Sequence, residues 1–336
     1  MERLSLSIVI PMYNHGEGIR KTLDSILSQI PSIEDICDLE IAITDNRSTD
    51  SSPAIIQNEY LPEYSDTIKY HRNETIIEMS KNCNKAIELS TKDYAWCLGD
   101  DVLIEGSIKD VCVTIQKYKK RNNSDPNFII VNNIRCTELG SPAVDDTLFS
   151  NKDFFYPDIY SLLKDALNTI FVLSNNIVLK DAWLKHYHNT NSSLKKFDSF
   201  HPHSDALVKI GMEDGGLIFI DRPLVGYTLG SREDNVYDEL IYALGSASVI
   251  SNNNLQLNKV SKFYHNERGN VYVWMRLLGK YRNIDFYMQD SVIKIVKHHK
   301  IFPFKLRFIV KILSYISTSF ALNFLFWKLQ YSFFRK

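Results

Sequence analysis

The stretch Leu4-Ser5-Leu6-Ser7-Ile8-Val9-Ile10-Pro11 decides the fold class of this chain, because it predicts an apolar β-strand that ends at a proline. The next apolar residues recur at helical spacing, namely Ile19, Leu23, Ile26, Leu27 and Ile30. Further strands are expected at residues 39–44, 67–71 and 94–98, with helices at residues 53–60 and 79–89. Strands that alternate with helices predict an α/β fold, a doubly wound and mostly parallel sheet flanked by helices and joined by right-handed crossovers.

Three polar clusters follow predicted strands of this sheet, at residues 11–16, 45–50 and 99–101. In a parallel sheet the carboxyl ends of the strands meet at one edge, and ligands bind there. We therefore expect the three clusters to form one ligand site. Farther along the chain, residues 128–131 and 169–179 are further strand candidates, and the pattern becomes helical from about residue 231.

The composition indicates a globular protein with a full core. The 336 residues are 44% apolar and 24% charged, which suits one large domain with an appendage. A net charge of -1 and the lack of a nucleic-acid-binding motif argue against a polynucleotide partner. Five cysteines without metal-ligand spacing fit a reducing cytosol, and the first residues enter a strand rather than a secretory signal. We expect a cytoplasmic catalytic part.

The C-terminal segment has a membrane-facing composition. Residues 312–327 carry no charge and are flanked by lysines and arginines. This run is shorter than the ~20 residues of a spanning helix. An amphipathic helix in the plane of an anionic cytoplasmic leaflet is the preferred interpretation, and an ordinary helical subdomain packed on the core is the alternative. The first interpretation predicts a protein that is peripheral on the cytoplasmic membrane.

Asp100 and Asp101 are adjacent carboxylates directly after the apolar run Trp96-Cys97-Leu98. Such a pair costs stability unless something cationic neutralises it. Mg²⁺ or Mn²⁺ takes one or two protein carboxylates and completes its shell with phosphate oxygens and water. The pair therefore indicates a divalent metal and a nucleotide diphosphate, with a solvated turn after the strand as the alternative interpretation.

Three stretches occur in order along the chain: Ser7-Ile8-Val9-Ile10-Pro11-Met12-Tyr13-Asn14, Leu23-Asp24-Ser25-Ile26-Leu27-Ser28-Gln29 and Thr44-Asp45-Asn46-Arg47-Ser48-Thr49-Asp50. Together they resemble the family 2 glycosyltransferases. The run Trp96-Cys97-Leu98-Gly99-Asp100-Asp101 looks most like the abequosyltransferase-type branch. The resemblance is specific over about residues 5–110. It implies the GT-A fold and transfer of a sugar from a nucleotide diphosphate donor with inversion at the anomeric carbon.

The resemblance also implies roles for residues beside the donor. Pro11, Tyr13 and Asn14 would shape the loop next to the nucleotide. Asp45 would accept a hydrogen bond from the base, and Asn46 would support the loop.

Two further donor-site positions follow the third predicted strand. Arg72-Asn73 matches the Arg-Asn pair of the family, although the glycine usually found shortly after it is missing here. Asn82, on the next predicted helix, matches a position that faces the donor.

The resemblance assigns the acidic pair to the metal. Asp101 would coordinate Mg²⁺ or Mn²⁺, and Asp100 would contact the ribose or a metal-bound water; the two roles could be exchanged. Many relatives carry a third acidic residue where this chain has Gly99 or Val102, depending on the alignment.

An inverting transfer also needs a base on the acceptor side. Family members place it in an acidic motif some hundred residues after the metal motif, at the start of a helix. Asp205 is the preferred candidate here, and Asp198 and His203 are alternatives because Ser204 interrupts the usual Glu-Asp pair. Asp205 could instead complement the helix dipole. His201 and His203 could bind metal, but an exposed turn before the helix is the simpler interpretation.

Two regions are expected: residues 1–230 as the nucleotide-sugar-binding and catalytic domain, and residues 231–336 as a helical, basic and aromatic extension. The expected partners are a nucleotide diphosphate sugar, a lipid-linked saccharide acceptor and the inner face of the cytoplasmic membrane, in the synthesis of a surface polysaccharide such as O-antigen. Two other functions stay open: a sugar-binding scaffold without catalysis, and a sugar nucleotidyltransferase. The latter needs a Gly-rich loop with a following lysine, which His15-Gly16-Glu17-Gly18 does not supply.

Overall fold

The computed structural model describes residues 3–138, 141–142, 149–166, 169–193, 202–213 and 215–227. The chain divides into two compact units, Met1–Ser192 with Ala206–Ser231, and Ser193–Asp205 with Arg232–Lys336. The predicted C-terminal extension, with its uncharged run 312–327, lies outside the described residues. Within the described ranges, no helix combines the length and the apolar character needed to cross a bilayer.

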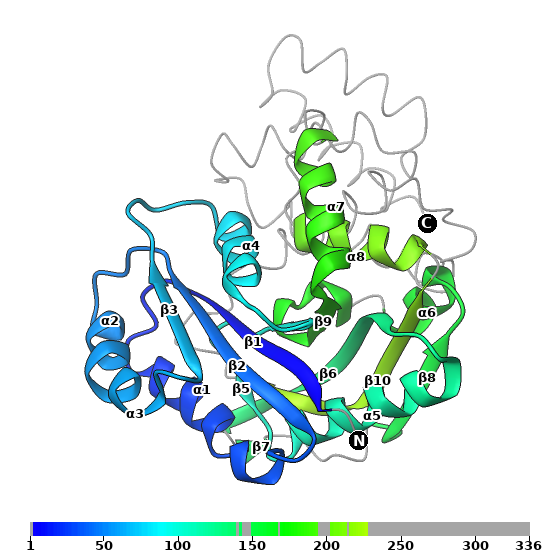
Figure 1. The fold of residues 1–336 in the computed structure, drawn as a ribbon, viewed down its shortest axis with the longest axis horizontal. Helices are drawn as coiled ribbons and strands as arrows, with labels where there is room; N and C mark the ends of the chain where they lie inside the picture. Colours follow the sequence, from blue (N-terminus) through cyan, green and yellow to red (C-terminus); the bar gives the residue numbers. More distant parts are fainter. Residues whose placement is uncertain are drawn as a thin grey trace, which may run out of the picture. The chain divides into compact units, whose positions relative to one another are not determined.

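The first half of the first unit has the predicted alternation of strands and helices (Figure 1). Its elements are β1 (Leu4–Met12), α1 (Gly18–Leu27), β2 (Cys37–Asp45), β3 (Ile68–Arg72), α4 (Met79–Leu89) and β4 (Tyr94–Cys97). A 3₁₀ turn at Ile30–Ser32 follows α1. Strand β1 pairs in parallel with β2 and β4, and β2 pairs in parallel with β3. The predicted doubly wound fold class is confirmed for this half.

The second half extends the same sheet. Its elements are β5 (Val102–Leu103), α5 (Ser107–Asn122), β6 (Pro126–Glu138), β7 (Ser141–Pro142), β8 (Lys152–Tyr156), α6 (Ile159–Ala166), β9 (Asn176–Leu179), α7 (Lys180–Ser193), α8 (Pro202–Met212) and β10 (Gly216–Tyr227). The described strands follow the order β3-β2-β1-β4-β9-β6-β10-β5, with β7 beside β6 and β8 beside β10. Strands β6 and β10 are parallel, whereas β9 runs antiparallel to both β4 and β6. The sheet is therefore mixed and mostly parallel.

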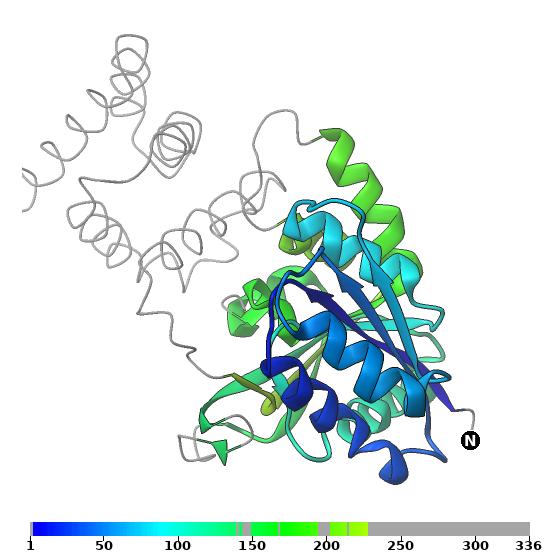
Figure 2. The same cartoon turned by 90° about the vertical axis from the view of Figure 1, so that its left-hand side faces the viewer.

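Helices cover both faces of the parallel strands. On one face, Leu6 and Ile8 of β1 join a core cluster with Ile19 and Leu23 of α1. Figure 2 shows α1 next to the helical segment of residues 52–64 on this face. On the other face, α4 packs against β1 and β2. Because both faces are buried, the strands read as nearly continuous apolar runs, which is why the sequence predicts them well.

The helix predicted at residues 53–60 is longer and less regular than expected. It consists of α2 (Ser52–Ile55), a π-helical turn (Ile56–Tyr60) and α3 (Leu61–Tyr64). Pro62 lies in the first turn of α3, where its missing N–H costs no hydrogen bond. The helix therefore continues past the predicted end.

The strand predicted at residues 169–179 is wrong over its first seven residues. These form two 3₁₀ turns, Thr169–Phe171 and Leu173–Asn175, and only β9 is extended. The Asn176 side chain donates to the carbonyls of Val172 at 2.6 Å and Ile170 at 3.2 Å. Such side-chain bonds to nearby backbone groups compete with strand pairing, and an apolar count alone does not detect them.

Candidate functional site

The carboxyl ends of β1, β2 and β4 lie at one edge of the sheet. Met12 pairs with Asp45, and Val9 pairs with Cys97, so the loops after the three strands begin side by side. The predicted convergence of the three polar clusters at one edge is confirmed.

The loops after β1 and β2 are joined by hydrogen bonds. The backbone amide of Asn14 donates to the Ser48 hydroxyl at 2.9 Å, and the Asn14 side-chain oxygen accepts from the Thr49 amide at 2.8 Å. Asn14 holds a left-handed backbone with φ of 53°, which asparagine adopts more readily than most residues. The Gly16 amide donates to the Asp50 carboxylate at 2.7 Å. This amide therefore has a partner within the chain, unlike the open amides of a phosphate-binding glycine loop.

Asp45 is fully buried at the end of β2. One of its oxygens accepts from the Ser48 amide at 2.7 Å, and the other accepts from the Tyr70 hydroxyl at 2.8 Å and lies 3.3 Å from Nε of Arg72. Burial and the bond to Asp45 raise the pKa of Tyr70, so Tyr70 stays a donor. In this arrangement Asp45 organises the loop that follows it, and a nucleotide base would reach its oxygens only after Tyr70 or the Ser48 turn moves.

Two arginines close the same turn through backbone carbonyls. Arg72 donates to the Ser48 carbonyl at 2.6 Å, and Arg47 donates to the Glu74 carbonyl at 2.9 Å. Arg47 has a φ of 64°, an uncommon conformation for a non-glycine residue. Both arginine side chains remain partly exposed at the edge of the sheet. The edge therefore presents guanidinium groups, which favour phosphate oxygens as partners.

Three asparagines form a buried network behind these loops. Asn73 donates to the side-chain oxygens of Asn82 at 2.9 Å and Asn46 at 3.2 Å. Asn46 exchanges two hydrogen bonds with the backbone of Ile77, and Asn82 exchanges two with Thr44 of β2. The network fixes the segment between β3 and α4 against β2. Asn82 is directed into this network and is only 2% exposed.

The acidic pair combines one exposed and one largely buried carboxylate. Asp100 is exposed, whereas Asp101 accepts a hydrogen bond from the Ser174 hydroxyl, and the Asp101 carbonyl accepts from Thr22 at 3.0 Å. Burial raises the pKa of Asp101 to about 6, the neighbouring charge of Asp100 adds to the rise, and the Ser174 bond opposes it. A buried carboxylate of this kind gains from a cation beside it.

These two carboxylates match the chemistry of a Mg²⁺ or Mn²⁺ site that the substrate completes. Among the described residues, no cluster of three or more histidine, cysteine, aspartate or glutamate side chains is present. Such ions use only one or two protein carboxylates when phosphate oxygens supply further ligands. At Gly99 a Cβ atom would meet only the Ser174 hydroxyl, at 3.9 Å, so a side chain would fit there. Val102, the other alignment position for a third acid, is buried in β5.

Ser174 is a site residue that the sequence interpretation missed. It lies in the second 3₁₀ turn, and its carbonyl accepts from the Trp96 indole at 2.8 Å, which ties the turn to β4. The sequence contains a signal for the turn, because Ser174, Asn175 and Asn176 are three consecutive turn-forming residues, but it contains none for the contact with Asp101.

The described residues include two of the candidates for the catalytic base, namely His203 and Asp205. Asp205 lies in the first turn of α8, in the second unit, and is 1% exposed. Asp198 and His201 lie outside the described residues. His203 is inside α8 and only 5% exposed, so the predicted exposed turn is wrong at this residue. The helix begins one residue before His203, and its first turn is buried rather than solvated. The catalytic role of Asp205 stays a prediction.

Part of the chain matches a known protein family. The family model described as Glycosyl transferase family 2 matches residues 7–133, which include both loops and the acidic pair. This part of the chain is similar to family 2 glycosyl transferases. The matched stretch begins within β1 and ends within β6.

Two curated relatives and one solved structure illustrate the similarity. The abequosyltransferase RfbV of Salmonella typhimurium is 26% identical over 231 residues, which cover 66% of this chain and 65% of the relative. The GalNAc(5)-diNAcBac-PP-undecaprenol beta-1,3-glucosyltransferase of Campylobacter jejuni is 30% identical over 168 residues, covering 48% of this chain and 52% of the relative. The crystal structure of S. aureus TarS 1-349 superposes with a TM-score of 0.62 at 15% identity, covering 99% of this chain and 92% of that one. The chain thus spans between half and two thirds of these curated relatives, and its fold is GT-A.

Proposed function

We propose that this protein is an inverting glycosyltransferase that moves a sugar from a nucleotide diphosphate donor to a lipid-linked saccharide in the synthesis of a surface polysaccharide. The observation that carries the proposal is the acidic pair Asp100 and Asp101 at the end of β4, beside the joined loops of β1 and β2, within the stretch that matches family 2. Carboxylates and cationic donors at one sheet edge suit a metal-bound diphosphate.

On the donor side, the two joined loops would hold the nucleoside. Tyr13 is 47% exposed directly after β1 and offers an aromatic surface, and Asn14 sets the path of its loop. Pro11, near the end of β1, would shape the approach to this loop. Asp45 would position the base indirectly, through the turn that it stabilises. If that turn opens, Asp45 would accept a hydrogen bond from the base itself. The S. aureus TarS fragment has been crystallised in complex with UDP, which supports a nucleotide as a ligand of this chain.

Asp101 and Asp100 would hold Mg²⁺ or Mn²⁺. When bound, the ion would stabilise the charge that develops on the departing diphosphate. The contribution of the chain itself is to hold Asp101 in one orientation through Ser174, and to leave Asp100 exposed toward ribose or water.

On the acceptor side, Asp205 would remove the proton of the attacking hydroxyl. The attack would occur opposite the leaving diphosphate, which produces inversion. A carboxylate suits this role because proton removal becomes favourable only as the glycosidic bond forms.

The acceptor and the location are proposed from the relatives. The name of the Campylobacter jejuni relative describes a substrate on undecaprenol diphosphate, and RfbV is an abequosyltransferase. A lipid-linked acceptor requires the enzyme to work at a membrane surface. We assign surface attachment on the cytoplasmic side to the basic and aromatic residues from about 294 onward.

The test measures the release of nucleoside diphosphate from nucleotide sugars whose base is uracil, thymine, cytosine or guanine, each with and without Mn²⁺. One donor class should be consumed by the wild-type protein. The variants Asp100→Asn and Asp101→Asn should lose turnover by about 100-fold or more, because they remove charge where an ion would bind.

Asp93→Asn is the matched control. Asp93 is exposed and directly precedes β4, at the end of the strand opposite the acidic pair. Its variant should turn over like the wild type. Equal losses in Asp93→Asn and Asp101→Asn, or no donor consumed by the wild type, would contradict the proposed transferase and favour the scaffold alternative.

A further inference from the structure

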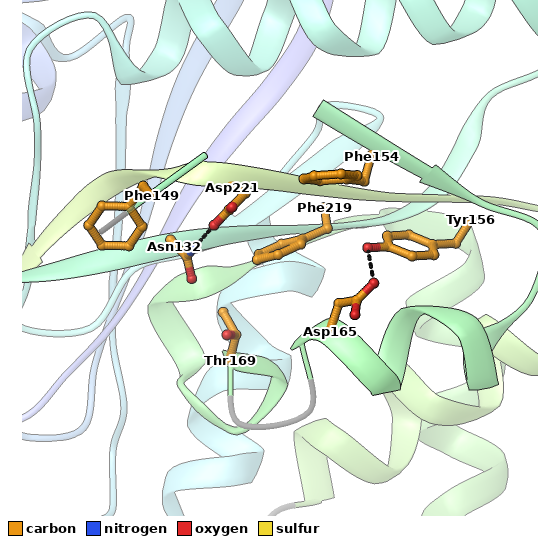
Figure 3. A pocket seen from close by; sticks show the side chains of 8 residues that line it. All are labelled: Asn132, Phe149, Phe154, Tyr156, Asp165, Thr169, Phe219 and Asp221. Atoms are coloured by element: carbon orange, nitrogen blue, oxygen red, sulfur yellow. Dashed lines mark hydrogen bonds between the residues drawn. The ribbon is translucent and has the colours of Figure 1, made fainter. Parts of the chain in front are cut away.

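A cavity of about 570 Å³ is lined by residues from the middle of β6 and β10, and its lining does not include the acidic pair (Figure 3). Four of its lining residues are aromatic: Phe149, Phe154, Tyr156 and Phe219. Its volume falls within the range of about 300–1,000 Å³ that is common for small-ligand sites. The proposed donor site uses none of these residues.

The strand register places this cavity level with the carboxyl end of β4, which directly precedes the acidic pair. Ile177 of β9 pairs with both Trp96 of β4 and Ile129 of β6, so β4 and β6 run parallel and in step. Ile130 of β6 pairs with Phe219 of β10. At about 4.8 Å per strand, β6 lies about 10 Å from β4 and β10 about 14 Å from it. A ligand in the cavity would therefore lie beside the donor rather than on it.

The aromatic side chains present flat apolar surfaces. Phe154 stacks on Phe219 with ring centroids 6.3 Å apart and planes inclined by 24°, and Tyr156 lies 6.4 Å from Phe154. Phe154 is 37% exposed although it lies beside two other rings, so part of its ring is available to a ligand. The C–H faces of a pyranose ring are the apolar part of a saccharide and pack on such surfaces.

The polar side chains of the cavity are acceptors and neutral donors. Tyr156 donates to Asp165 at 2.8 Å, and Asn132 donates to Asp221 at 2.6 Å, as the dashed lines of Figure 3 show. The Thr169 hydroxyl also lines the space. Asp221 also accepts from the Ser150 amide at its second oxygen. The bond from Tyr156 engages one oxygen of Asp165, and a carboxylate accepts strong hydrogen bonds from hydroxyl groups at the other.

The charge of the lining selects against an anionic ligand. The described lining residues include Asp165 and Asp221 and no lysine, arginine or histidine. Two carboxylates would repel a diphosphate or an acidic sugar, whereas a neutral polyhydroxyl ligand gains from both the acceptors and the rings.

We propose that this cavity is an acceptor subsite that binds a neutral saccharide unit next to the one that receives the transferred sugar. The assignment as an acceptor subsite rests on the proposed function. The expected binding of a saccharide rests on the cavity alone. The strand register supports the proposal, because it places the cavity level with the end of β4, beside the proposed donor position.

Saturation-transfer NMR with the full chain tests the binding directly. The probes are methyl glycosides of glucose, galactose, mannose and N-acetylglucosamine, each with and without a saturating mixture of UDP, CDP, dTDP and GDP with Mn²⁺. At least one glycoside should give a signal that persists with the nucleotides present. Phe154→Leu should reduce this signal several-fold, and Thr169→Val, which keeps the volume and removes the hydroxyl, should reduce it as well.

Phe155→Leu is the matched control, because Phe155 is the next residue of β8 and packs on Tyr118 instead of lining the cavity. Its signal should equal that of the wild type. The proposal is overturned by the absence of any glycoside signal, by equal losses in Phe154→Leu and Phe155→Leu, or by complete displacement of the glycoside by nucleotide.

The failure of the two proposals can be told apart. Glycoside binding that depends on Phe154, in a protein that consumes no nucleotide sugar, would support the subsite and contradict the transferase. If a donor is consumed, Phe154→Leu should raise KM for a saccharide acceptor by about tenfold. An unchanged KM would overturn the subsite while the transferase stands.

Discussion

Ser174 is the residue on which the orientation of Asp101 depends, since its hydroxyl donates to that largely buried carboxylate. Neighbours that hold a metal-binding carboxylate typically affect metal affinity or activity by about 10–100-fold when they are removed. Ser174→Ala should therefore raise the Mn²⁺ concentration needed for half-maximal nucleotide binding or turnover by about tenfold.

Ser174→Thr retains a hydroxyl and should restore most of the Mn²⁺ response. Titration of Mn²⁺ at fixed nucleotide, read by thermal unfolding, measures both variants. If Ser174→Ala and Ser174→Thr shift the Mn²⁺ midpoint equally, the hydroxyl has no role in orienting Asp101.

At the same scale, the sequence predicts site residues that directly follow a strand. It does not predict site residues that a distant part of the chain brings into contact with them. Asp45 and Asp101 are identifiable because each follows an apolar run directly. Ser174 reaches Asp101 from 73 residues away, and no local spacing encodes that contact. The burial of Asp45, which is fully enclosed by its own loop, is equally a property of the folded chain.

At the scale of elements, Glu40 connects several parts of the parallel sheet. It lies in β2, is 4% exposed, and accepts from Ser7 of β1 at 2.7 Å and from the Thr91 amide before β4 at 2.7 Å. Lys69 of β3 forms an ion pair with it at 2.6 Å. Burial alone would raise the pKa of Glu40, but the bonds from Lys69, Thr91 and Ser7 together lower it.

Glu40→Gln should reduce the free energy of unfolding by about 1–3 kcal/mol at pH 7, because it removes a buried, hydrogen-bonded charge. Since the folded pKa of Glu40 lies below its ordinary value of 4.5, its contribution is present above that value and is lost as the pH falls below it. Urea denaturation at pH 7 and near pH 4 should show a smaller difference at the lower pH.

Glu34→Gln, at an exposed position between α1 and β2, is the control and should change little at either pH. A difference between Glu40→Gln and the wild type that is the same at both pH values would contradict the ionised network.

Elements of the first half are predictable because buried parallel strands are apolar throughout and their helices have regular spacing. The second half depends on pairings between distant segments, such as β9 inserted between β4 and β6. Residues 169–175 have an apolar content that predicts a strand, and the Asn176 side chain converts part of them into turns.

At the scale of the whole sheet, both proposed ligand positions lie near the level of the carboxyl end of β4. The donor side comes from β1, β2 and β4, whose polar ends are visible in the sequence. The cavity comes from β6, β8 and β10, with lining residues spread from Asn132 to Asp221. Residues so far apart in the chain form no recognisable sequence motif. The donor edge could therefore be predicted from the sequence, and the cavity could not.

The measurement that tests the central claim most directly is a thermal-shift titration of the full chain with UDP, dTDP, CDP and GDP, each with and without Mn²⁺. The account predicts that one nucleotide raises the midpoint by about 5 °C at saturation only when Mn²⁺ is present. Asp101→Asn should lose this shift, and Asp93→Asn should keep it. No shift with any nucleotide, or the same shift in Asp101→Asn as in the wild type, would contradict a metal-assisted donor site at the end of β4.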